Sequence, residues 1–181
     1  MSWVQIPPGL PQIKELLMKE LHKQKIQEMF DNASMIMAEG NTITPIFFIV
    51  KENVFNGILS KDNWTIKQYK DAVIKMAEQM DADAIIAVCE QFMVTLNKKD
   101  QRLQDLLDGK IRPSEQPDKE EYLTVIYIQP NGESESIIGK IHQNLSSQVR
   151  YIKDSKWISN PRTNLFSSWG SAVLPEEKGI H

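Results

Sequence analysis

The hydrophobic positions in the first part of the chain repeat at the spacing of a helix. From Gln12 to Glu39 apolar side chains recur every three or four residues, the periodicity of an amphipathic helix. Pro11 stands where the missing N–H of proline costs little, and Gly40 is the residue type that commonly ends a helix in the left-handed conformation. The pattern predicts one long helix with both ends marked.

A strand-like pattern follows this helix. Residues 43–50 (ITPIFFIV) and 54–59 carry β-branched and aromatic side chains, and a polar turn at 51–53 separates them. We therefore expect a β-hairpin. Thr65 and Gln68 then have the spacing of a capping box, which predicts a second amphipathic helix that covers one face of a sheet.

The second half of the chain adds further strands. Residues 84–89 (AIIAVC) are continuously apolar, as in a central strand buried on both faces. A short helix around 103–107 and a polar, proline-bearing stretch form a surface excursion. Turn chemistry at residues 130–132 (PNG) then predicts a hairpin of two antiparallel strands, 122–128 and 135–141, and 149–158 predicts one strand more.

The resulting order is α-β-β-α-β-(α)-β-β-β. We interpret it as an α+β protein, a mixed α/β sandwich with one mixed, mostly antiparallel sheet. The strand-helix-strand sequence further predicts that 54–59 and 84–96 are parallel, joined by a right-handed crossover. Residues 1–158 are predicted to form a single domain, and 159–181, rich in Asn, Pro, Ser and Gly, an irregular C-terminal tail.

Composition and charge limit the class of protein. The chain has 181 residues, of which 41% are hydrophobic, and a formal net charge of −3. This excludes a disordered chain and gives no global reason to bind nucleic acid or a membrane surface. The first eleven residues lack the basic and apolar segments of a secretory signal, and Cys89 is the single cysteine. We expect a cytoplasmic protein that does not interact with membranes.

Cofactor and metal motifs are missing from the sequence. None of the glycine-rich phosphate loops occurs, and the three histidines and one cysteine are not clustered as zinc ligands. We therefore predict no cofactor and no metal ligand set. Cys89 ends an apolar run, which favours a packed core thiol over a nucleophile.

Two carboxylates are the first candidates for chemistry. Glu90 lies where the central strand turns polar, Glu121 begins the next strand, and Arg112 lies in the loop between them. If the strands are neighbours, the two carboxylates could bind Mg²⁺ or act as acid and base, with Arg112 stabilising an anion and His142 as a further candidate. The structural alternative, which we favour, is that Arg112 clamps the loop to the strand ends.

A second candidate region is basic. Lys140, Arg150, Lys153 and Lys156 lie among aromatic side chains, a pattern that could grip phosphates and stack bases. An ordinary edge strand, in which lysines block aggregation, has the same composition and is the interpretation that we favour.

The long first helix could instead present a protein-binding surface. Its C-terminal half carries Met29, Met35 and Met37, and Trp3 precedes it. We hypothesise that this helix or the tail binds a protein partner or a second copy of the chain, although core packing explains most of the same residues.

Residues 89–93 (CEQFM) and the loop 112–118 (RPSEQPD) together form the most distinctive pattern. They resemble an uncharacterised group of small bacterial and phage proteins in which a Glu-x-aromatic-Met strand end precedes an Arg-Pro-Ser-Glu-x-Pro-Asp loop and a strand. The resemblance covers about 45–142, and Phe92 stands where that group more often has tryptophan. It implies a compact intracellular domain encoded by a bacterium, phage or mobile element, and it supplies no catalytic residues.

Two functional hypotheses follow from these observations. The first is a non-catalytic intracellular interaction protein that binds a partner or itself. The alternative is a metal-dependent hydrolase or nuclease that acts on a phosphoester or nucleic acid, built from Glu90, Glu121, Arg112 and His142.

Overall fold

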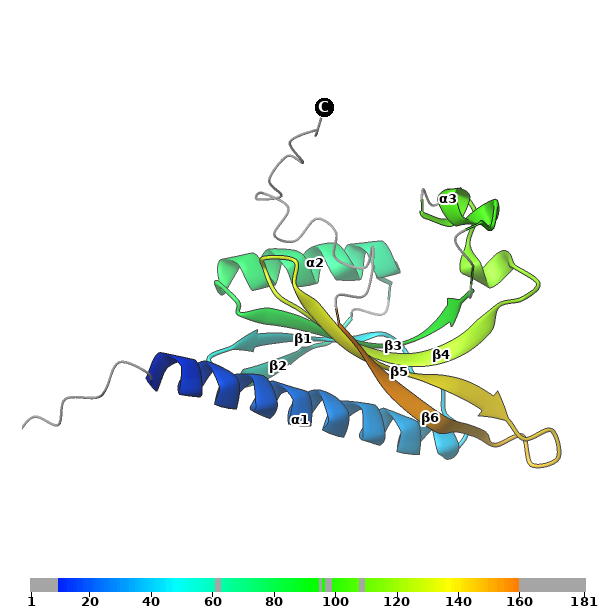
Figure 1. Ribbon diagram of the computed structural model, residues 1–181, viewed down its shortest axis with the longest axis horizontal. Helices are drawn as coiled ribbons and strands as arrows, with labels where there is room; N and C mark the ends of the chain where they lie inside the picture. The colour runs from blue at the N-terminus through cyan, green and yellow to red at the C-terminus, as the bar shows by residue number, and fades with distance from the viewer. Residues whose placement is uncertain (1–9, 61–62, 95, 97–98, 108–109, 160–181) are drawn as a thin grey trace, which may run out of the picture.

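The computed structural model describes residues 10–60, 63–94, 96, 99–107 and 110–159 (Figure 1). One six-stranded sheet forms its centre, in the order β2-β1-β3-β4-β5-β6. The helices are α1 (Leu10–Ala38), α2 (Ile66–Gln79), α3 (Arg102–Leu107) and the 3-10 turn η1 (Pro113–Glu115). The strands are β1 (Ile46–Lys51), β2 (Val54–Ile58), β3 (Ala84–Met93), β4 (Glu120–Ile128), β5 (Ser134–Gln143) and β6 (Arg150–Ser159). The predicted α+β class is confirmed.

The two long helices lie on opposite faces of the sheet (Figure 1). Helix α1 packs through Ile26, Phe30, Ala33 and Met37 against one face, together with alternate residues of β3, β4 and β5. Helix α2 packs through Tyr69, Val73 and Ala77 against the other face. Each side of the sheet therefore has its own apolar core, as expected when consecutive strand residues point to opposite faces.

Local sequence signals place the ends of these helices. Gly40 follows α1 with a φ of +92°, in the left-handed region, as its position in the sequence predicted. At the start of α2 the Thr65 hydroxyl accepts from the backbone N–H of Gln68 at 3.2 Å, and the Gln68 side chain accepts from the Thr65 N–H at 2.8 Å. Both halves of the predicted capping box are present.

The arrangement of β1, β2 and β3 differs from the prediction. Strand β1 lies between β2 and β3 and is antiparallel to both. Strands β2 and β3 thus run in the same direction but are not neighbours, and every neighbouring pair among the described strands is antiparallel. The physical reason is burial, because the apolar β1 has both faces covered when it is internal, whereas β2 is more exposed and suits the sheet edge.

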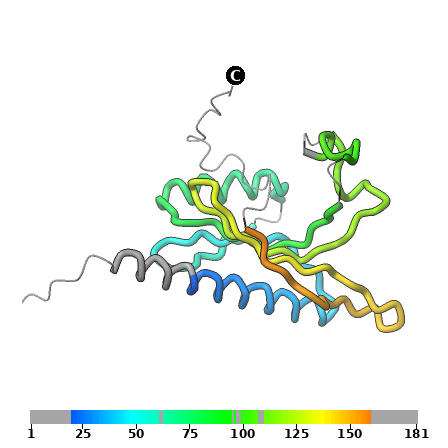
Figure 2. Tube along the Cα trace, viewed as in Figure 1, coloured from blue at the N-terminus to red at the C-terminus, as the bar shows by residue number. Residues whose placement is uncertain are grey.

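The chain after α2 passes back and forth through β3, β4, β5 and β6 (Figure 2). The predicted 130–132 turn joins β4 to β5, with Gly132 at a φ of +83°. Strand β6 ends the sheet order, and within the described residues it pairs only with β5. Its pairing shifts between Gly139 and Ile141, where Lys153 and Asp154 together lie opposite Lys140, which is the pattern of a β-bulge.

The predicted tail begins at Ser159, which is the last residue of β6, and the rest of it lies outside the described residues. Trp3 also lies outside them. Among the described helices, none is long and apolar enough to cross a bilayer.

Candidate functional site

Two predicted carboxylates do meet in the structure, and an arginine joins them. Arg150 Nη1 donates to Glu90 Oε1 at 3.0 Å, and Arg150 Nη2 lies 2.8 Å from Glu90 Oε2. The same Nη2 lies 3.0 Å from Glu121 Oε1. One guanidinium therefore holds a carboxylate from β3 with two parallel bonds and a carboxylate from β4 with a third contact. We call these three residues the arginine clamp.

Strand register brings the clamp together on the α1 face of the sheet. Glu90 lies opposite Leu123, and Glu121 precedes Leu123 by two residues in β4, so it lies on the same face. Arg150 opens β6 and lies opposite Gln143 of β5, from where its side chain extends across β5. The clamp therefore joins β3, β4 and β6, which are well separated in the sequence.

The clamp is largely sheltered from solvent. The side chains of Glu90, Arg150 and Glu121 are 9%, 17% and 36% exposed. Glu90 Oε1 also accepts from the backbone N–H of Ile43 at 2.8 Å, which fixes the segment between α1 and β1. The bonds to Glu90 raise the pKa of the Arg150 guanidinium, with a smaller contribution from Glu121, so this group stays charged.

The chemistry of this arrangement is that of a structural ion-pair network. Arg150 supplies the positive charge between the carboxylates, at the place where a catalytic cation would bridge them. Among the residues that the structure describes, no group of three or more His, Cys, Asp or Glu side chains is placed to hold a metal ion. A hydrolase at this position would first have to displace the guanidinium.

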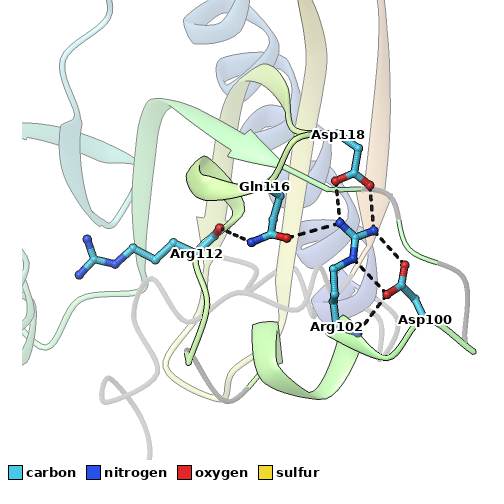
Figure 3. A network of polar contacts seen from close by, with 5 residues as sticks. All are labelled: Asp100, Arg102, Arg112, Gln116 and Asp118. Atoms are coloured by element: carbon cyan, nitrogen blue, oxygen red, sulfur yellow. Dashed lines mark hydrogen bonds and ion pairs between the residues drawn. The ribbon is translucent and has the colours of Figure 1, made fainter.

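Arg112, the arginine expected between the carboxylates, is not part of the clamp. It is exposed, and its carbonyl accepts from Gln116 Nε2 at 3.4 Å while its side chain points away (Figure 3). The prediction that Arg112 joins Glu90 and Glu121 was therefore wrong. An arginine does join the two carboxylates, as predicted, but it is Arg150 of β6. The sequence argument chose Arg112 because it lies between Glu90 and Glu121 in the chain.

A different arginine organises the loop between β3 and β4. Arg102 binds Asp118 through both Nη atoms, at 2.7 and 2.9 Å, and Asp100 through Nε and Nη2, at 3.1 and 2.9 Å (Figure 3). Arg102 lowers the pKa of both aspartates through these hydrogen bonds. This second network joins the beginning of the β3–β4 connection to its end.

His142 does not join the carboxylates. It follows Ile141, which belongs to the α1 core, so its side chain is on the opposite face of β5. There its ring stacks on Tyr151 with centroids 5.5 Å apart. The candidate set Glu90, Glu121, Arg112 and His142 is thus divided between the two faces of the sheet and an exposed loop, because adjacent strand residues point in opposite directions.

The four basic candidates have different environments. Lys140 pairs with Glu120, whose pKa this bond lowers, and Arg150 is held in the clamp. Lys153 and Lys156 are exposed on β6, and within the described part of the chain no carboxylate pairs with them. Of the four candidate phosphate-binding residues, Lys153 and Lys156 are thus the two whose charge is not paired with a described carboxylate.

Cys89 is a core residue. It is 5% exposed, and burial followed by the nearby charge of Glu90 raises its pKa to about 11. The thiol is therefore protonated at neutral pH, as expected of a packed cysteine.

A groove lies between α1 and β6 and was not predicted. It has a volume of about 610 Å³ and is lined by Glu20, Leu21, Lys23, Gln24, Gln27 and Trp157. Leu21 is 46% exposed and Trp157 is 41% exposed. We call these six residues the α1–β6 groove. The exposed Trp157 within a strand-like segment was the sequence signal for it, but the helix that completes the groove is distant in the chain.

A smaller cavity of about 180 Å³ lies beside His22. The His22 ring contacts the Tyr127 hydroxyl at 3.2 Å through Nδ1 and the Asn53 side-chain oxygen at 3.2 Å through Nε2. These contacts join α1 to β4 and to the β1–β2 turn, so His22 is occupied in holding the helix on the sheet.

Comparison with protein-family models, curated proteins and solved structures finds no match for this chain.

Proposed function

We propose that this chain is a non-catalytic intracellular interaction protein that binds an extended polypeptide along β6. The observation that carries the proposal is the position of β6 at the end of the sheet order, where, among the described strands, it pairs with β5 alone. An unpaired strand side presents backbone N–H and C=O groups that a further strand can bind. We call this side of Arg150–Ser159 the β6 edge.

The surroundings of the β6 edge favour specific binding. Trp157 of β6 lines the α1–β6 groove together with residues of α1, and there Trp157 and Leu21 are exposed. A strand added to β6 would direct alternate side chains toward this groove. Backbone bonds would then supply affinity, and the groove would supply selectivity.

The arginine clamp supports the same proposal. It fixes the first residue of β6 to β3 and β4, so the edge is held in an extended form before a partner arrives. Preorganisation lowers the entropic cost of binding. The residues that suggested catalysis thus have a structural purpose in this proposal.

Site-specific photo-crosslinking tests the proposal in the cells that make the protein. Ser155 is replaced by p-benzoyl-phenylalanine to probe the β6 edge, and Asp71 on α2 is replaced in the same way as a matched exposed control. We expect a crosslinked product of defined mass at position 155, identified by mass spectrometry, and none at position 71. Equal labelling at the two positions, or none at either, would overturn the proposal.

The metal-dependent hydrolase remains the alternative because Glu90 and Glu121 do converge. Calorimetric titration of the full chain with Mg²⁺ and Mn²⁺ separates the two hypotheses. The interaction protein is expected to show no binding at micromolar concentrations. Tight binding that disappears in Glu90→Gln, with the fold retained, would favour the hydrolase.

A further inference from the structure

We infer that the strand that binds the β6 edge is β6 of a second copy of this chain, in an antiparallel, two-fold arrangement. The inference rests on the proposed function, which requires only that some strand binds there. Its basis is the pattern of side chains along β6 and the position of its bulge.

The bulge makes β6 symmetric about Ser155. Lys153 and Asp154 lie opposite the single residue Lys140, so they count as one position of the pairing. The strand Arg150–Ser159 then has equal numbers of pairing positions before and after Ser155. An antiparallel copy centred on Ser155 would therefore use the whole strand, and a two-fold axis would relate the two halves.

In the same register, the α1 face of one copy continues into the α1 face of the second copy. Ile152 and Trp157 belong to the α1 face, since Ile152 lies opposite Ile141 and Trp157 lies opposite Ile137. In the symmetric pairing these two become cross-strand neighbours. Tyr151 and Ile158 become neighbours on the other face, so both apolar pairs form twice.

The exposed large side chains fit this pairing. Tyr151 is 43% exposed and Trp157 is 41% exposed in the single chain. Buried tryptophan and tyrosine carry much of the energy in protein interfaces. Each Trp157 would lie between the α1 residues of the α1–β6 groove in its own chain and Ile152 of the other copy.

Charge complementarity selects the register. The bulge, with Asp154, lies opposite Lys156 of the second copy, and this ion pair also forms twice. Both side chains are exposed, and the structure pairs neither with another described residue. A shift of the register by two positions would place the two-fold axis at the bulge and bring Asp154 opposite its own counterpart, so like charges disfavour that register.

Lys153 is expected to weaken the association of the two copies. It shares the bulge with Asp154 and places a second positive charge near Lys156 of the other copy. Lysines and bulges on edge strands prevent indiscriminate pairing. We therefore expect a concentration-dependent dimer, because one strand pair also buries less area than the roughly 800 Å² per partner of a standard interface.

Sedimentation velocity over a wide concentration range tests the inference on the full chain. The unmodified protein is expected to dimerise. Asp154→Lys leaves three lysines together at each bulge, which should raise the dimer dissociation constant by about tenfold or more. The double variant Asp154→Lys/Lys156→Asp restores opposite charges and should restore the dimer. Asp71→Lys makes the same charge change on α2 and should have no effect.

The outcomes separate the inference from the proposed function. A dimer that tolerates Asp154→Lys, or a double variant that stays monomeric while its melting curve is normal, overturns the two-fold pairing. A purified monomer at all concentrations, combined with crosslinking from position 155 to a different protein or a nucleic-acid complex, also overturns it. In the protein case the proposed function survives, whereas an absence of crosslinks at position 155 would remove both.

Discussion

Gly139 shows how closely one residue of β5 is packed. A Cβ atom at this position would lie 2.6 Å from Ile152 Cγ2 and 2.8 Å from Phe30 Cζ. Gly139→Ala must therefore displace the side chains of Ile152 and Phe30, and we expect it to reduce the free energy of unfolding by about 1–3 kcal/mol. Urea denaturation measures this loss.

Gly57 offers the matched control. A Cβ atom there would lie 3.4 Å from Phe48 Cε1, which is ordinary contact. Gly57→Ala should leave stability within about 0.5 kcal/mol of the unmodified protein. Equal losses at both positions would contradict the packing argument.

The arginine clamp gives a second prediction at the scale of residues. Arg150→Ala leaves the sheltered Glu90 carboxylate without its counter-charge, and we expect a loss of roughly 2–4 kcal/mol. Arg112→Ala removes an exposed arginine whose side chain points away from the loop network, so it should cost less than about 0.5 kcal/mol. Chemical denaturation of the two variants would show comparable losses if the clamp were only a surface contact.

Part of the arginine clamp could be predicted from the sequence and part could not. Glu90 and Glu121 could be predicted to meet because each marks the polar end of a strand and the two strands follow each other in the chain. Arg150 could not be assigned, because it is separated from Glu90 by 60 positions. Only the order of β3, β4, β5 and β6 brings it across the sheet.

Among the elements, the connection between β3 and β4 is held by its own charges. Arg102 lowers the pKa of Asp100 and Asp118 below their ordinary value of 3.8. A carboxyl whose pKa is lower in the folded chain stabilises it above that ordinary value, and the stabilisation is lost as the pH falls through the lowered pKa. The network should thus persist at neutral pH and open only in acid.

Carboxyl-carbon NMR titration of Asp118 checks this prediction. The midpoint in the unmodified protein should lie below 3.8, and in Arg102→Gln it should move up toward that value. An unchanged Asp118 midpoint would show that the Arg102 bonds do not persist in solution.

Helices and hairpins were predicted better than their arrangement. The capping box at Thr65, the glycine after α1 and the 130–132 turn are local signals, and each element formed where they indicated. The position of β1 between β2 and β3 is not local, because it depends on which strand can bury both faces. The rule for parallel crossovers gave the right direction for β2 and β3 but not their neighbours.

For the molecule as a whole, Cys89 reports on cooperative unfolding. Its side chain is buried in β3 and its pKa is raised to about 11, so in the folded chain roughly a thousandth of the thiol would be ionised at pH 8. We expect iodoacetamide to label the native protein only through opening of the sheet. Labelling should become fast in concentrated guanidinium chloride.

The clamp variant links this measurement to stability. Arg150→Ala should increase the labelling rate of Cys89 in proportion to its lower free energy of unfolding, whereas Arg112→Ala should not. Rapid labelling of the unmodified protein would show that β3 is accessible without global unfolding.

The self-contained connection between β3 and β4 has a consequence for protein engineering. Its Arg102 network is made by residues of the connection itself, and it projects away from the sheet (Figure 1). The β3–β4 register is set by nine residue pairs from Ile85 to Met93. Because the entropy of loop closure grows slowly with length, foreign segments can be grafted between residues 94 and 119 to make this chain a display scaffold.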